Sequence, residues 1–332
     1  MDFQPTQEQR DLRSGVRALL ARWYGREVLR AAVDAVDAPA AVLDRGLWRE
    51  LGAAGFFALR LPEAAGGVGL GLAEAVLVFE EAGRALLPGP LVATHLAAGA
   101  VPGAAEGTAV VTAFDLGGGG GPGAPGAPGA PGVPGVPGGA LVAHLGEADA
   151  VLGSGVDPAA LLRRGEPVRS ADPLTPLHRV PAPADGAEVA PYRDEGALLT
   201  AALQLGSALR TLELAVRHAK EREQFGQPIG GFQAVKHLCA GMLVRAELAR
   251  TAVYAAAVTA DPVEIAGAKL LADEAAVGNA RDCLQVYGGM GFTWEADVHL
   301  HLKRAWLGAA QWRTAGEAEE VLAADLLATG GV

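Results

Sequence analysis

The sequence predicts a mainly α-helical protein with a small β domain in its middle. Apolar residues recur at three- and four-residue steps through the first hundred residues and again, more strongly, after Asp194, which is typical of amphipathic helices. Between these stretches lie short apolar or β-branched runs bounded by Gly, Pro and Asp, as expected of strands. We therefore expect an N-terminal helical domain at 1–107, a β domain at 108–192 and a C-terminal helical domain at 193–332.

Three helices are predicted in the first domain. Thr6 can cap the first helix because its hydroxyl can accept a hydrogen bond from a free backbone N–H, and Leu12 and Val16 follow at helical spacing. A second helix is expected to end within 52–55, where glycines stand, and a third to cover 73–85. The apolar faces of these helices supply the candidate core of the domain.

The predicted β domain contains an unusual insertion. Residues 109–114 and 140–152 are predicted strands. Between them, at 117–139, glycine returns at every third position in Gly-Ala-Pro and Gly-Val-Pro triplets. A collagen helix needs this glycine, but also two further chains and many more triplets. Because glycine and proline bury little apolar area against the entropy of ordering them, we expect a flexible surface insertion.

The helical signal is strongest in the last domain. Three long apolar stripes cover 198–216, 235–253 and 265–284, and a shorter helix is expected at 298–310. Alanine and glycine on these stripes let helices approach closely. This favours a compact antiparallel bundle.

Composition argues against several classes of protein. The chain has 27 basic and 38 acidic side chains, a net charge of −11, which disfavours a basic surface for nucleic acid. No stretch reaches the roughly 18 uninterrupted apolar residues of a membrane span. The polar start lacks the basic and apolar regions of an export signal. We expect a cytoplasmic protein without membrane or nucleic-acid partners.

Cysteine and histidine indicate no metal site. Cys239 and Cys283 stand far apart in apolar helical surroundings, so we expect buried packing residues rather than a disulfide or a C-x-x-C site. His299 and His301 are the only close histidine pair, and on a helix their spacing directs them to different faces.

The segment 222–233 carries groups suited to an anionic ligand. Its sequence, Arg-Glu-Gln-Phe-Gly-Gln-Pro-Ile-Gly-Gly-Phe-Gln, joins two predicted helices and leads into the start of the second. A guanidinium, amide side chains and the backbone N–H groups of a helix N-terminus all favour a pyrophosphate with its sugar and base. An ordinary turn between helices, with a solvated Arg222, is the alternative reading.

A second segment, Gln285-Val-Tyr-Gly-Gly-Met-Gly-Phe-Thr-Trp-Glu295, ends the third long stripe in glycines. Glycine can adopt the left-handed conformation that closes a helix, and it also lets a backbone come close to a ligand. A plain helix terminus remains the alternative.

Taken together, in this order and at this separation, the two segments closely resemble the C-terminal signature of the acyl-CoA dehydrogenase family. Leu61-Pro-Glu-Ala-Ala-Gly-Gly-Val-Gly-Leu70 and Glu80-Glu81-Ala-Gly-Arg84 resemble its N-terminal domain. The resemblance covers residues 1–105 and 194–310. It implies a helical domain, a β domain that is shortened here, and a C-terminal four-helix bundle, with FAD and an acyl-CoA thioester as ligands.

The resemblance also implies which residues contact the cofactor. In the family, FAD lies across a subunit interface, with the flavin ring on one subunit's β domain and the adenosine diphosphate end on the neighbour's bundle. Carried over by position, the residues that contact the adenosine diphosphate end are Arg222, Gln224, Phe225, Gln233, Gln285 and Gly289.

The family's catalytic base has no counterpart at the matching positions. Family members remove the proton α to the thioester carbonyl with a glutamate, while the β-hydride goes to the flavin. The two base positions known in the family fall at Trp312 and Gly196, and Glu195 is the neighbour of the second. An indole N–H only donates hydrogen bonds and cannot accept that proton. The family's Thr-Glu-Pro and Trp-Ile-Thr segments, which cradle the flavin ring, are also missing from the middle domain.

Three hypotheses follow from this resemblance. The chain is similar to the short subunits of heterotetrameric acyl-CoA dehydrogenases of steroid degradation, so a longer partner would supply the base while this chain completes the FAD site. Alternatively, the chain is a self-sufficient dehydrogenase that uses Glu195, although one residue's shift on a helix turns a side chain by about 100°. A third possibility is a structural subunit without flavin. The identity of the acyl-CoA does not follow from the sequence.

Overall fold

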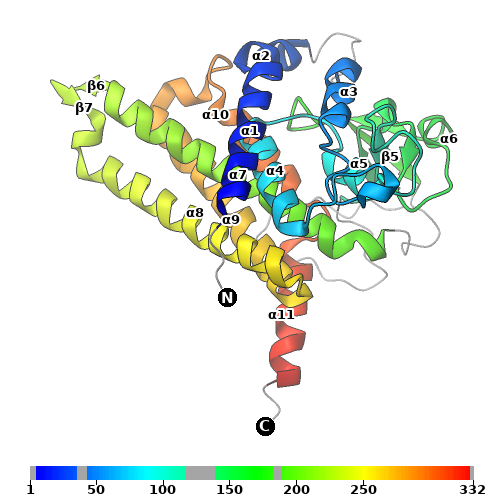
Figure 1. The fold of residues 1–332 in the computed structure, drawn as a ribbon. Coiled ribbons are helices and arrows are strands. Elements are labelled where there is room, and N and C mark those ends of the chain that lie inside the picture. Colours follow the sequence, from blue (N-terminus) through cyan, green and yellow to red (C-terminus); the bar gives the residue numbers. More distant parts are fainter. Residues whose placement is uncertain (1–4, 36–42, 117–138, 182–188, 330–332) are drawn as a thin grey trace.

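Helices dominate both ends of the chain, and the larger strands gather between them (Figure 1). The computed structural model describes residues 5–35, 43–116, 139–181 and 189–329. Apart from Gly139, the predicted insertion at 117–139 lies outside these described residues. The mainly helical fold class, with a small β region, is confirmed.

The N-terminal part contains the helices expected there and two more. Thr6 caps the first helix in a capping box: its hydroxyl accepts from the Gln9 N–H, and the Gln9 side chain accepts from the Thr6 N–H. Two short helices were not predicted individually, α2 and α5. The helices in order are α1 (Gln7–Trp23), α2 (Arg26–Asp34), α3 (Arg45–Ala53), α4 (Leu72–Arg84) and α5 (Leu91–Ala97).

The middle region holds two small sheets. β1 (Val111–Thr112) pairs in parallel with β3 (Ala150–Val151). β2 (Gly139–Ala143), β5 (Leu177–Pro181) and β4 (Glu166–Val168) form an antiparallel sheet in that order, with α6 (Pro158–Leu162) nearby.

The prediction of one strand over 140–152 is wrong. The chain leaves the sheet after Ala143, because His144 has a φ of 56° and a 3-10 turn follows at Leu145–Glu147. His144 Nδ1 lies 2.7 Å from a carboxylate oxygen of Glu147. This local pairing stabilises the turn that separates β2 from β3.

The C-terminal part is built on three long helices that run back and forth along one another (Figure 1). Asp261 caps the third helix, whose first residue is Pro262, a favoured start for a helix. These helices match the three predicted stripes. The elements are α7 (Arg193–Glu221), α8 (Gln233–Thr259), α9 (Pro262–Tyr287), α10 (Val298–Gly308) and α11 (Ala315–Thr329).

Two glycines let α4 pack directly on α7. A Cβ added to Gly206 would lie 1.9 Å from the carbonyl oxygen of Glu80, and one added to Gly83 would lie 2.0 Å from the carbonyl oxygen of Leu203. The two helix backbones therefore touch where they cross. This contact joins the N-terminal helices to the bundle.

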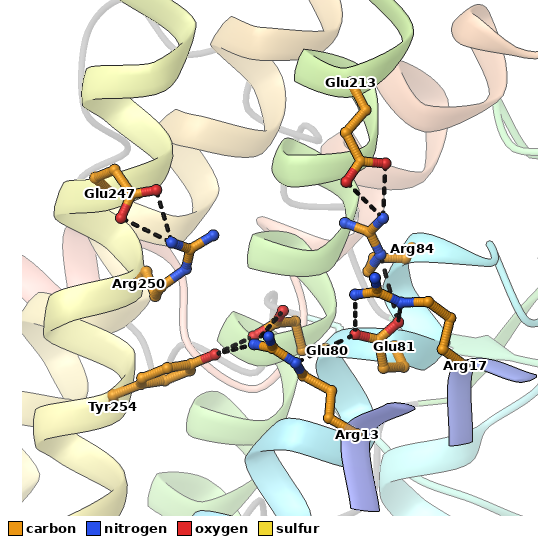
Figure 2. Close-up of polar contacts among 9 residues, drawn as sticks. All are labelled: Arg13, Arg17, Glu80, Glu81, Arg84, Glu213, Glu247, Arg250 and Tyr254. Atoms are coloured by element: carbon orange, nitrogen blue, oxygen red, sulfur yellow. Dashed lines mark hydrogen bonds and ion pairs between the residues drawn. The ribbon is translucent and has the colours of Figure 1, made fainter. Parts of the chain in front are cut away.

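A polar network crosses the same junction (Figure 2). Glu80 and Glu81 on α4 are buried. Arg17 on α1 donates to both oxygens of Glu81, at 2.7 and 2.6 Å, and the Tyr254 hydroxyl on α8 donates to Glu80 at 2.6 Å. Burial raises the pKa of Glu80. The network ties α1 and α8 to α4, where buried carboxylates require such partners.

The cysteine prediction holds for one residue and not for the other. Cys283 is buried, whereas Cys239 is half-buried, and both are free thiols. The helix α8 turns Cys239 toward its partly exposed side. Among the helices in the described ranges, none combines the length and the apolar character needed to cross a bilayer.

Candidate functional site

The segment that joins α7 and α8 forms a small exposed hairpin at one tip of the molecule (Figure 1). β6 (Glu223–Gln224) pairs with β7 (Gln227–Pro228) across a two-residue loop. Phe225 and Gly226 in that loop have φ values of 55° and 78°, as the tightest hairpin turn requires. Phe225 is 93% exposed, and Arg222 and Gln224 are exposed beside it.

The start of α8 follows the hairpin after a 3-10 turn at Ile229–Gly231. Gln233 is the first residue of this helix, and its cap residue, Phe232, makes no side-chain capping bond. The first backbone N–H groups of a long helix are therefore left for another partner, and they attract negative charge. Phe232 packs edge-on against Phe225, with ring centroids 6.0 Å apart.

The end of α9 forms the other half of this region. Gln285 is exposed in its last turn, and Gly288 closes the helix with a φ of 61°. A Cβ added to Gly289 would meet no atom within 4 Å, so the space beside this backbone is open. Glycine thus leaves room for the close approach of a ligand.

The structure brings all six predicted cofactor residues to the same end of the bundle. Because α7 and α9 run in the same direction, their last turns lie together, and the ring of His218 stacks on that of Tyr287 with centroids 4.1 Å apart. The start of α8 meets them there through the hairpin. Large apolar side chains are also exposed at this end, namely Phe225, Met290 and Phe292.

The two predicted base positions touch each other near the opposite end of α7. A Cβ added to Gly196 would lie 2.2 Å from an indole carbon of Trp312, so the tryptophan ring fills the space in which a side chain at 196 would stand. Trp312 is buried, and its indole N–H has no hydrogen-bond partner among the described residues. Its backbone N–H donates to the Asp115 carbonyl at 2.6 Å, with a φ of 60°.

Glu195 faces away from this contact. Its carboxylate forms an ion pair with Arg60 and lines a separate cavity of about 320 Å³ together with His95 and Tyr192. Burial lowers the pKa of His95 to about 4, so this imidazole is neutral at pH 7. The shift of one residue along α7 therefore carries Glu195 to another side of the helix, as the helical rotation predicts.

A buried ion pair near Trp312 was missed by the sequence reasoning. Lys269 on α9 is fully buried, pairs with Asp273 and donates to the Gly308 carbonyl at 2.9 Å. Gln204 on α7 donates to the same Asp273 at 3.0 Å and to the Ala305 carbonyl at 2.9 Å. These bonds fix the end of α10, which leads to Trp312. The signal was available: Lys269 and Asp273 are four residues apart on one helix.

Asp115 is a second group that sequence reasoning missed. Its carboxylate accepts a hydrogen bond from the Gln311 side chain at 2.9 Å, next to Trp312. Withdrawal from water raises the pKa of Asp115 to about 7. The residue follows β1 in a loop, where periodicity carries no signal for a titratable group.

Comparison with known proteins identifies the two helical parts. Residues 6–111 match the model of the acyl-CoA dehydrogenase N-terminal domain, and residues 190–326 match that of the acyl-CoA dehydrogenase C-terminal domain. The first match contains the motifs at 61–70 and 80–84, and the second contains the hairpin and the end of α9.

Similar proteins are found over nearly the full length. Acyl-CoA dehydrogenase IpdE2 of Mycobacterium tuberculosis is 37% identical and the alignment covers 92% of this chain and 93% of the relative. The structure of the Tcur3481-Tcur3483 steroid ACAD has a TM-score of 0.79 and 27% identity over 98% of both chains. The ChsE4-ChsE5 complex from Mycobacterium tuberculosis has a TM-score of 0.77 and 25% identity over 100% of both chains. The matching domains and the full-length relative show that the chain belongs to the acyl-CoA dehydrogenase family.

Proposed function

We propose that the chain is a companion subunit of an FAD-dependent acyl-CoA dehydrogenase. Its bundle end would hold the adenosine diphosphate half of an FAD, while a longer chain of the same family would supply the base and the flavin-ring site. The observation that carries this proposal is the packing of Trp312 against Gly196, which occupies both positions where a base is expected.

As a member of the family, the chain is an oxidoreductase with FAD as its cofactor. When bound, FAD accepts the hydride that leaves the β-carbon of the acyl-CoA. The hairpin end has the groups that the diphosphate needs: the exposed guanidinium of Arg222, the uncapped start of α8 at Gln233 and the open backbone at Gly289. Gln224 and Gln285 would offer amide groups to the ribose and adenine, and Phe225 an aromatic face.

The proposed division of labour rests on the chemistry of the filled position. The lone pair of the indole nitrogen belongs to the aromatic ring system and cannot accept a proton, and a glutamate at 196 would collide with the ring of Trp312. Glu195 is held by Arg60 on the other side of α7. At the contact of Trp312 with Gly196, the chain would orient neighbouring groups and exclude water, and it would transfer no proton.

Two observations support a partner of the same family. The solved relatives include structures of two named chains together, Tcur3481-Tcur3483 and ChsE4-ChsE5. The exposed apolar side chains at the hairpin end, Phe225 and Phe292 among them, are typical of a surface that another chain covers. By the same relatives, we propose a steroid-derived acyl-CoA as substrate in a heterotetramer.

Co-expression with a longer family member tests the proposal. The purified complex should contain one FAD per pair of chains and oxidise acyl-CoA, whereas this chain alone should show little or no turnover. Two flavins per pair, or full turnover by this chain alone, would refute the companion role. A colourless, FAD-free complex would instead identify a structural subunit without flavin.

The self-sufficient reading has one observation in its favour, since the Glu195 carboxylate faces a cavity of about 320 Å³. Glu195→Gln in the chain assayed alone separates the two readings. Loss of a measurable turnover would assign the base to Glu195. The companion proposal expects no turnover to lose, and it expects the variant to support full activity of the complex.

A further inference from the structure

A second and larger cavity lies where the N-terminal helices meet the bundle. It has a volume of about 420 Å³ and is lined by α1, α2, α4, α7 and the start of α10. Its lining contains none of the six predicted cofactor residues and neither Gly196 nor Trp312, although Arg217 bonds the Tyr287 side chain at the end of α9. A volume of this size is enough for a small organic ligand.

The lining of this cavity is divided into an apolar wall and a basic wall. The apolar wall carries four leucines from three helices and the loop after α4, namely Leu20, Leu29, Leu86 and Leu214. The basic wall carries arginines from α1, α4 and α7, namely Arg17, Arg84, Arg210 and Arg217. Such a division suits a molecule with an apolar body and an anionic group.

The basic wall has more guanidinium groups than carboxylates. Arg17 binds both oxygens of Glu81, and Arg84 binds both oxygens of Glu213 through one nitrogen, at 2.8 and 2.7 Å (Figure 2). Arg210 reaches the same Glu213 only at 3.4 Å. Three arginines thus share two carboxylates.

The remaining groups around the cavity do not cancel this excess. Arg217 is a fourth arginine on the same wall. Arg26 is balanced by Asp297 at 2.5 Å. Burial and the nearby arginines lower the pKa of His301 to about 3, so it adds no charge at pH 7. The cavity therefore carries a net positive charge, which an anion would neutralise.

Tyr24 adds an unpaired polar group to the residues that line the cavity. It lines the cavity at 5% exposure, and its hydroxyl has no hydrogen-bond partner in the described part of the chain. Buried hydroxyl groups are almost always hydrogen-bonded, because leaving one unpaired costs about 1–3 kcal/mol. A ligand oxygen within hydrogen-bond reach of this hydroxyl would remove the cost.

We propose that this cavity binds a small amphiphilic anion, with a carboxylate or phosphate head on the arginines of α7 and a short apolar body along the leucines. The site is separate from the proposed FAD contacts, and its occupation does not depend on the companion role. The Glu80-Glu81-Ala-Gly-Arg84 motif thereby has a ligand-facing role in Arg84, in addition to its packing role.

Isothermal titration of the full-length chain tests the proposal. Octanoate and octyl phosphate are the probes for the two head groups, and octanamide is the uncharged control. Octanoate or octyl phosphate should bind saturably at one site, and octanamide should bind at least about tenfold more weakly, because it lacks the charge-assisted hydrogen bonds. The tighter of the two anions identifies the head group.

Variants locate the binding in this cavity. Arg210→Gln combined with Arg217→Gln should weaken binding by about ten- to hundredfold, and Ala21→Phe should block the cavity without removing a charge. Arg250→Gln is the matched control, since this arginine pairs with Glu247 on its own helix and should leave binding unchanged. Circular dichroism confirms that each variant is folded. Absence of saturable binding, or equal binding by wild type and the two cavity variants, would overturn the proposal.

Discussion

The two ends of α7 differ in burial and in the exposure of their polar groups. Near its start, Gly196 is buried under the ring of Trp312, and the surrounding groups are fixed by buried ion pairs. At its far end, the hairpin exposes Arg222, Gln224 and Phe225, with free helix N–H groups beside them. One end is closed by buried packing and the other exposes polar groups to solvent. One helix thus combines a closed end and an open end.

The largest expected effect follows from removing the Trp312 ring at the start of α7, the closed end. Trp312→Ala should lower the free energy of unfolding by about 3–5 kcal/mol, because it removes a large buried side chain. Phe225→Ala removes an aromatic ring from the exposed hairpin and should change stability by less than about 0.5 kcal/mol. Urea unfolding followed by circular dichroism measures both. Similar values for the two variants would contradict the contrast between the ends.

The next effect concerns the hairpin end of α7, the open end. Arg222→Ala should weaken FAD retention by the assembled complex by about ten- to hundredfold, since it removes charge-assisted hydrogen bonds to a phosphate. Folding should be unaffected because Arg222 is exposed. Flavin absorbance after gel filtration measures retention, with Arg250→Ala as the charge-matched control. An unchanged flavin content would mean that the cofactor contacts are assigned to the wrong residues.

A smaller effect appears in the pH dependence of stability. The pKa of His95 falls from 6.5 to about 4 because of burial, so the unfolded chain binds an extra proton between these values. Stability should therefore fall as pH decreases through this window, by roughly 1 kcal/mol per pH unit from this group.

His95→Gln should reduce the slope with which the free energy of unfolding falls between pH 7 and pH 5. His218→Gln is the comparison at the open end, where the histidine is only half-buried, and it should alter the slope less. An identical slope in wild type and His95→Gln would show that another group causes the loss.

The sequence predicted the helices well and the small strands poorly. Apolar spacing located α7, α8 and α9, and Thr6 marked a helix start that the structure confirms. The strand prediction at 140–152 failed because His144 leaves the sheet through a positive φ, which no periodic pattern reveals. Three-residue strands such as β4 carry too few residues for a period to be read.

The candidate site was predictable where it is continuous in sequence. The hairpin and the end of α9 each appear as one run of residues. They lie together because α7, α8 and α9 alternate in direction, which brings the ends of α7 and α9 next to the start of α8. The packing of Trp312 on Gly196 was not predicted, because it depends on where the segment after α10 lies on α7. The pair of Arg60 and Glu195 likewise joins residues far apart in the chain.

The direct contact between Gly83 and Gly206 has a consequence for the arginine cavity beside it. Arg84 follows the first glycine, and Arg210 lies one turn beyond the second, so these two arginines of the basic wall are anchored at a point where neither helix can move inward. A ligand would enter a cavity whose width is already fixed, and the helices would not need to move apart. Its association rate would then not be limited by a rearrangement of the protein.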